Sequence, residues 1–187
     1  MVADILVAAV NALRRRSPPG PPLMTVPSVD LTRYLGRWYE VGRLPNPEQD
    51  GNGRRCVDVV ATYTARPDGT VTVHNTARDA AAGLRRRSVR ARARAVDDSG
   101  ARLRVVFFGL FGGDYWVLGL DEAYRWAVVG TPSRRRLWLL SRTPALPPDD
   151  YARALSIAAA QGYDPARIVP TLQSAAQDSI VRVPAVT

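Results

Sequence analysis

The chain has 187 residues, 46% of them hydrophobic, which is enough for one domain with a buried core. Its formal net charge is +9, and all 26 basic residues are arginine. This charge permits anionic partners such as lipid surfaces, carboxylates, phosphates or nucleic acid, and does not choose among them. A single Cys and a single His argue against an internal disulfide and a structural zinc site, so we expect no metal and no cofactor.

The first residues predict a short amphipathic helix over 2–14, with one apolar face made of Ile5, Leu6, Ala9, Val10 and Leu13. The helix could dock on its own domain or fray, rest on an anionic membrane surface, or be a degenerate export signal. The following "SPPGPP", residues 17–22, predicts a stiff linker. We therefore predict an N-terminal arm over residues 1–27.

Strands and turns alternate from residue 36 onward, a pattern typical of an all-β domain. In "RPDGT", Asp68-Gly69 supplies the positive φ that a tight hairpin requires. The expected strands are 37–44, 56–65, 71–77, 88–96, 102–108, 115–120, 125–130 and 136–142.

A helix follows the last strand, with Asp149 or Asp150 as its expected N-cap and Gly162 as its stop. The eight strands and this helix predict an eight-stranded antiparallel up-and-down β-barrel with one C-terminal α-helix packed outside. We assign residues 28–172 to the barrel and helix, and 173–187 to a C-terminal tail.

One end of such a barrel has a candidate seal. The first and last strands pair in a closed meander, so Trp38 at the start of one and Arg142 at the end of the other meet at the same end. A guanidinium stacked on the indole would close that end, and Gly36 would let the entering chain turn beneath it. The segment "DLTRYL", residues 30–35, predicts a short helical turn that covers the bottom.

These segments resemble the lipocalin family. "GRWYE" is similar to the family's first signature, "LDEAYRWAVV" to the second and "LWLLSRTP" to the third, in the right order. The resemblance covers about residues 28–172 and is closest to the bacterial outer-membrane and apolipoprotein D-like members. It implies the binding, storage or transport of a fatty acid or lysophospholipid for membrane lipid maintenance, and a possible homodimer. Outer-membrane members carry a lipid-modified Cys near the N-terminus; because this chain has none there, we expect it in the cytoplasm or at a membrane periphery, with the cell envelope as the alternative.

Strand alternation, helped by the resemblance, predicts which side chains face the lumen. Arg90, Arg92 and Arg94 mark the outer face of their strand, so the small residues between them face inward and leave volume for a ligand. The strand over 115–120 is apolar on both faces, and there only the resemblance favours Tyr115 and Val117. The predicted ligand-binding residues are Val60, Val71, Val73, Asn75, Val89, Ala91, Ala93, Tyr115, Val117 and Val128.

Loops at the unsealed end carry three arginine clusters. This predicted basic rim contains Arg54, Arg55, Arg85, Arg86, Arg87, Arg134, Arg135 and Arg136. The rim could be no more than solvated loops, or it could attract an anionic head group or an anionic membrane surface.

Other functions have less support. An enzyme needs an acid, base or nucleophile constellation, and His74 has no apparent partner pattern, so we predict no catalytic residues and no enzymatic activity. Nucleic-acid binding would need aromatic side chains interleaved with arginine, so we expect no nucleic-acid partner. The alternatives kept open are a haem-binding or other small-molecule barrel with enzymatic activity, and an arginine-rich protein that binds membrane or nucleic-acid surfaces.

Overall fold

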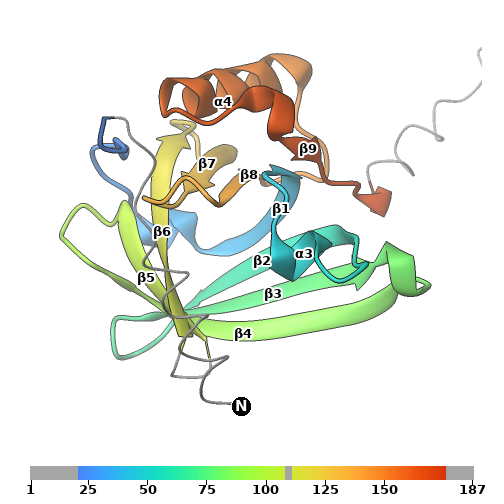
Figure 1. The fold of residues 1–187 in the computed structure, drawn as a ribbon. Coiled ribbons are helices and arrows are strands. Elements are labelled where there is room, and N and C mark those ends of the chain that lie inside the picture. Colours follow the sequence, from blue (N-terminus) through green and yellow to red (C-terminus); the bar gives the residue numbers. More distant parts are fainter. Residues whose placement is uncertain (1–20, 108–110, 176–187) are drawn as a thin grey trace, which may run out of the picture.

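Eight antiparallel strands close into a barrel in the computed structural model, which describes residues 21–107 and 111–175. Each strand pairs with the next, and β1 pairs with both β8 and β2, which closes the ring (Figure 1). The predicted up-and-down barrel is therefore confirmed. The strands are β1 (Gly36–Arg43), β2 (Cys56–Ala65), β3 (Val71–Asp79), β4 (Arg85–Ala95), β5 (Arg102–Phe107), β6 (Phe111–Leu120), β7 (Trp126–Gly130) and β8 (Leu137–Ser141).

The predicted C-terminal helix is α4 (Pro148–Ala160), which lies outside the barrel wall (Figure 1). Its expected cap was wrong, because the helix begins at Pro148 with no side-chain cap bond. Asp149 and Asp150 lie instead in the first turn, where negative charge is favourable beside the helix dipole.

The remaining elements are short. The expected turn near residue 30 is α2 (Leu31–Tyr34). The sequence did not indicate α3 (Pro47–Asp50), the two-residue strand β9 (Val169–Pro170), or the 3₁₀ turns η1 (Ala80–Ala82) and η2 (Pro165–Arg167). Strand β3 ends two residues later than expected and β4 begins three residues earlier, because the two strands stay paired as far as Asp79 and Arg85.

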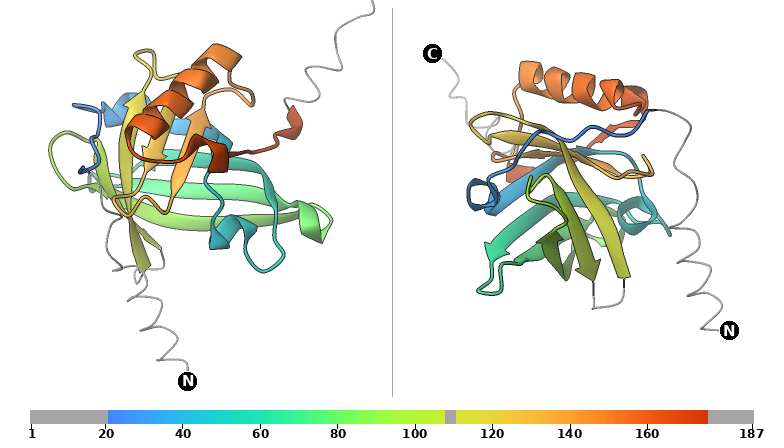
Figure 2. Two further views of the ribbon diagram at one scale, coloured as in Figure 1. Left: turned by 45° about the horizontal axis from the view of Figure 1, so that its top comes forward. Right: turned by 90° about the vertical axis from the view of Figure 1, so that its left-hand side faces the viewer.

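Two hydrophobic clusters flank the barrel wall. The inner cluster fills the closed end and includes Trp38, Leu103 and Val129. The outer cluster lies between the wall and α4 and includes Leu139, Ala154 and Ala158. Figure 2 shows α4 outside the strands from two further directions. Strands β7 and β8 are therefore apolar on both faces.

The described part of the expected N-terminal arm packs against the barrel. Leu23 is buried in the outer cluster, and the Val26 amide donates to the Val117 carbonyl. The amide of Met24 donates to Gln161 at the end of α4. The expected helix over 2–14 lies outside the described residues.

The C-terminal segment closes a gap between β1 and β2. These strands pair only from Gly36 to Tyr39, after which β1 turns to β9. Gln173 lies in the gap and donates its side-chain amide to the carbonyls of Glu40 and Val59. Gln173 is therefore part of the barrel wall, although we assigned it to the tail.

The end of the barrel at which β1 begins is sealed by Trp38, which is 0% exposed. The Arg142 guanidinium lies 3.8 Å from the centroid of its ring. The same guanidinium donates to the carbonyls of Arg33, Leu35, Arg37 and Tyr124. Gly36 has a φ of +90°, which an L side chain rarely adopts, so glycine is needed for the turn beneath the indole.

Replacing Trp38 with Ala should lower the free energy of unfolding by about 3–5 kcal/mol, because it empties a fully buried aromatic site. Urea unfolding would measure the change. Trp116→Ala is the matched control: Trp116 is only half-buried and lies under Arg102, so its loss should be smaller. Equal losses in the two variants would contradict a sealing role for Trp38.

Candidate functional site

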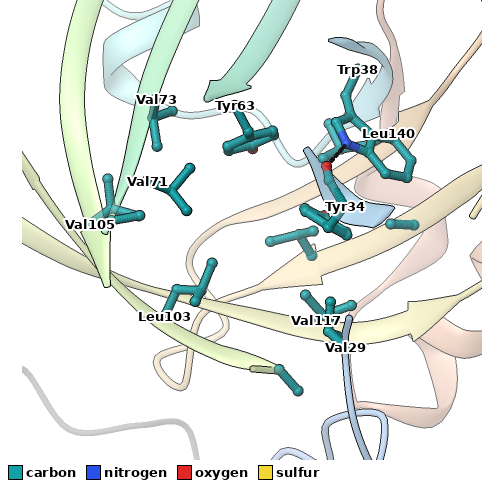
Figure 3. Packing of buried hydrophobic residues seen from close by; sticks show 14 residues of the cluster. Val29, Tyr34, Trp38, Tyr63, Val71, Val73, Leu103, Val105, Val117 and Leu140 are labelled. Atoms are coloured by element: carbon teal, nitrogen blue, oxygen red, sulfur yellow. Dashed lines mark hydrogen bonds between the residues drawn. The ribbon is translucent and has the colours of Figure 1, made fainter. Parts of the chain in front are cut away.

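The barrel interior is filled at the sealed end. It is accessible near the opposite, open end of the barrel, which we call the mouth. Inward side chains at the sealed end, such as Val117, Val129 and Leu140, are at most 4% exposed. Inward side chains nearer the mouth are only half-buried: Ala61, Asn75, Val89, Ala91, Phe107 and Trp138. Tyr115, which contacts Tyr34 and Tyr63 nearer the sealed end, is also half-buried. Because these residues face the inside of a closed ring, their exposed surface faces the lumen. Figure 3 shows the filled part, with Tyr63, Val71 and Val73 on one wall and Trp38 and Leu140 on another.

Eight of the ten predicted ligand-binding residues face this lumen. Val71, Val73, Ala93 and Val117 are buried in the inner cluster, and Ala91 and Tyr115 pack against it half-buried. Asn75 and Val89 pair with each other one step nearer the mouth.

Val60 and Val128 lie on the other face, contrary to the prediction. Val128 packs in the outer cluster under α4, and its neighbour Val129 takes the inward position. Val60 alternates with Ala61, which is in contact with the inner cluster. Both faces of β7 are apolar, so alternation alone could not decide which face points inward.

Several lumen residues were missed. Tyr63 is in phase with Val71 and Val73 through the β2–β3 register and could have been inferred from it. Tyr34 comes from α2, and no strand alternation reports on it.

A buried ion-pair network lies where β1 reaches the mouth. The Arg43 guanidinium, 3% exposed, donates to Glu40 at 2.8 Å and to both carboxylate oxygens of Asp50. Glu40 also accepts from Thr171 at 2.6 Å and from Gln49 at 2.7 Å. Arg43 thus joins β1, α3 and the C-terminal segment. Its positive charge is neutralised by the carboxylates of Glu40 and Asp50.

Burial and hydrogen bonding move the pKa values of the two carboxyls in opposite directions. Burial raises the pKa of Glu40, although Arg43, Thr171 and Gln49 oppose it. Burial also acts to raise the pKa of Asp50, but hydrogen bonds from Arg43 and from the Asn46 amide outweigh it and lower that pKa. Glu40 therefore takes up a proton before Asp50 as the pH falls.

The predicted basic rim is partly engaged within the protein. Arg134 donates to the carbonyls of Gln161 and Pro21, and Arg136 pairs with Glu48 at 2.8 Å. Arg54 donates to the Glu48 carbonyl, Arg87 lies 3.5 Å from Asp79, and Arg135 also has a partner. Arg85 and Arg86 are exposed, with no ion pair to any described residue. Arg55 is exposed, and its backbone amide donates to Asp79.

Other reactive side chains lie away from the lumen or are inert. His74 is on the outer face of β3, and its Nε2 contacts the Ser88 hydroxyl at 2.7 Å. Burial raises the pKa of the Cys56 thiol, which disfavours the thiolate. No group of three or more His, Cys, Asp or Glu among the described residues could hold a metal ion. None of the described helices combines the length and apolar character needed to cross a membrane.

A closed barrel with one sealed end and an accessible lumen defines the class of barrels that bind small apolar ligands. Within this class the chain belongs to the lipocalin family: residues 29–173 match the family model described as a lipocalin-like domain.

Named relatives agree with the assignment of the chain to the lipocalin family. The chain is 37% identical to temperature-induced lipocalin-1 of Arabidopsis thaliana over 158 residues, covering 80% of this chain and 82% of that protein. It is 36% identical to outer membrane lipoprotein Blc of Escherichia coli (strain K12) over 169 residues, covering 88% and 93%. It is 28% identical to apolipoprotein D of Mus musculus over 167 residues, covering 86% and 84%.

Solved structures show the same fold at low identity. Insecticyanin from Manduca sexta aligns with a TM-score of 0.65 at 16% identity, covering 83% of this chain and 87% of that one. The amine-binding protein of Rhodnius prolixus, solved with tryptamine, aligns with a TM-score of 0.62 at 10% identity, covering 87% and 94%. At these identities the likeness extends to the fold alone.

Arg43→Met should lower the free energy of unfolding at pH 7 by about 3–5 kcal/mol, because Glu40 is left buried without a cation. The pKa of Glu40 should then rise further, and a carboxyl with a raised pKa favours the folded state only while protonated. The loss should therefore shrink as the pH falls through the raised pKa of Glu40 toward the range in which an exposed carboxyl is also protonated. Denaturant unfolding at two pH values would measure it, with Arg54→Met as the control. A loss that did not depend on pH would contradict this account.

Proposed function

We propose that the barrel binds one acyl chain of a fatty acid or lysophospholipid in its lumen and carries or stores it for membrane lipid maintenance. The observation that carries this proposal is the change along the lumen from buried to half-buried inward side chains. The accessible part is lined mainly by apolar residues, two of them the small side chains of Ala61 and Ala91. A narrow apolar lumen suits an unbranched chain, because burial of each methylene contributes about 0.8 kcal/mol.

The name of one related protein supports a lipid ligand. That relative is apolipoprotein D, whose name marks it as the protein part of a lipid–protein particle. We infer the same class of ligand for this chain. Solvent extraction of the purified protein followed by mass spectrometry would identify the bound molecule.

Ala91→Trp should abolish or strongly weaken fatty-acid binding, because the indole would fill the accessible lumen. The matched control is Arg92→Trp, which places the same side chain on the outer face of the same strand. Displacement of a fluorescent fatty acid would measure both affinities, and circular dichroism would check folding. If a folded Ala91→Trp variant bound as tightly as Arg92→Trp, the ligand would lie elsewhere.

We infer a carrier and not an enzyme. The unfilled space lies in the lumen, whereas the His74–Ser88 pair is on the outer wall. The carboxylates of Glu40 and Asp50 near the mouth are engaged with Arg43.

We also propose that the mouth prefers an anionic head group, held by Arg85 and Arg86. These two members of the predicted basic rim lie at the start of β4. Arg85 is in phase with the inward residues Val89 and Ala91, whereas Arg86 is in phase with Arg90 on the outer face and pairs across the strands with Arg78, so positive charge gathers on both faces of the rim. Arginine binds carboxylate and phosphate through paired hydrogen bonds. The same charge would favour an anionic membrane surface over a zwitterionic one.

Reversing both charges, in Arg85→Glu with Arg86→Glu, should weaken binding of lysophosphatidylglycerol by about tenfold or more and leave lysophosphatidylcholine nearly unchanged. The effect should fade at high salt. Reversal of Arg90 and Arg94 on the outer wall is the control. Equal binding of the two lysolipids by the unaltered protein would contradict the head-group site.

We propose the cell envelope as the compartment, because two related bacterial proteins are named outer membrane lipoproteins. The sequence-based expectation of a cytoplasmic protein has no support from these relatives. The homodimer stays a prediction, which sedimentation analysis would test. The division into arm, barrel and tail also stays a prediction.

A further inference from the structure

Three tyrosine hydroxyls meet at the deep end of the lumen. Tyr34 comes from α2, Tyr63 from β2 and Tyr115 from β6. The Tyr115 oxygen lies 2.8 Å from that of Tyr34 and 2.9 Å from that of Tyr63. The rings pack against one another, with centroids of Tyr34 and Tyr63 5.7 Å apart and those of Tyr63 and Tyr115 6.2 Å apart. We call these residues the tyrosine cluster.

The cluster has more hydrogen-bond donors than it uses. A phenol has one donor proton, so three phenols bring three protons. The two contacts within the cluster use two of them, whichever oxygen donates in each. The described part of the chain offers no other acceptor to these hydroxyls. One buried donor is therefore left over, and an unpaired buried donor is costly.

Ionisation does not remove this donor. Burial is the main cause that raises the pKa of Tyr63 to about 12, and it raises the pKa values of Tyr34 and Tyr115 well above their usual range. All three hydroxyls therefore keep their protons at neutral pH, and the count of three donors holds.

The cluster borders the lumen through Tyr115, and its unused proton can lie on any of the three phenols because the chain of two contacts can run in either direction. Tyr34 and Tyr63 are 2% and 5% exposed, whereas Tyr115 is half-buried on the inward face of β6. Figure 3 shows Tyr34 and Tyr63 within the filled part of the interior. One rung nearer the mouth, the Asn75 Oδ1 atom is also buried and has no partner. A ligand that reaches the cluster thus meets polar groups in need of partners at its deep end.

The chemistry favours a neutral oxygen. An ionised carboxylate would need several donors or a cation to offset its desolvation, and here one donor is free. Arg142, at the sealed end, lies over Trp38 and donates to four backbone carbonyls. A hydroxyl or carbonyl oxygen accepts one hydrogen bond without a charge to compensate, and a hydroxyl can also donate to Asn75.

We propose that the tyrosine cluster is a subsite for a hydroxyl or carbonyl oxygen at the buried end of the ligand. The barrel would then select acyl chains that carry a neutral oxygen near the terminal carbon over plain hydrocarbon chains. This inference rests on the proposed binding of an acyl chain in the lumen.

The test compares hexadecanoic acid with 16-hydroxyhexadecanoic acid by displacement of a fluorescent fatty acid. The key variant changes Tyr34, Tyr63 and Tyr115 together to Phe, which keeps the rings and removes all three hydroxyls. A single Phe substitution would not serve, because it removes a donor together with at least one contact that used one. The affinity ratio of the hydroxylated to the plain acid should fall by about tenfold or more in the triple variant. An unchanged ratio would overturn the proposal.

A second measurement needs only the unaltered protein and covers the case of a misfolded variant. A hydroxyl in mid-chain, as in 8-hydroxyhexadecanoic acid, should be penalised because it meets apolar wall, whereas the terminal hydroxyl should not be. Equal penalties for both hydroxyls would overturn the subsite and leave lipid binding intact. If neither hydroxylated nor plain acid bound, the proposed function itself would fail, and the subsite with it.

Discussion

The contact on which the barrel most depends is the stack of Arg142 on Trp38. It joins the first and last strands, so it closes the ring of strands and the sealed end at once. The guanidinium also satisfies carbonyls of α2 and of the strand entry, which would otherwise lack partners near an apolar seal. The indole donates to the Tyr34 carbonyl and so fixes the residue that carries one hydroxyl of the tyrosine cluster. The seal and the floor of the lumen are therefore one structure.

The mouth is stabilised by different physics. There the strands β1 and β2 separate, and the gap is closed by polar contacts of the C-terminal segment and by the ion pairs of Arg43. Buried ion pairs add little stability over apolar packing, but they are costly to break singly. Such a network suits an end of the barrel that must remain ordered without being filled by apolar side chains.

The sequence predicted the inward face of a strand correctly where polar and apolar side chains alternate along it. Strand β4 alternates arginine with small residues, so its inward face could be read directly, and Ala91 and Ala93 point inward. Strand β7 is apolar throughout because α4 covers its outer face, so Val128 was assigned to the wrong side. α3 and β9 are too short for a periodic signal, and the tyrosine cluster joins residues from three distant elements. Contacts of that kind depend on the tertiary register and cannot be inferred from local pattern.

The accessible lumen also bears on stability. Protein interiors are normally close-packed, so half-buried inward residues such as Ala61 and Ala91 give up contacts that a filled core would make. The sealed end and the layer under α4 must offset that loss. A ligand that fills the space restores the missing contacts only in the folded state. Its binding should therefore stabilise the barrel in proportion to the logarithm of ligand concentration above the dissociation constant, which couples the occupancy of the carrier to its resistance to unfolding.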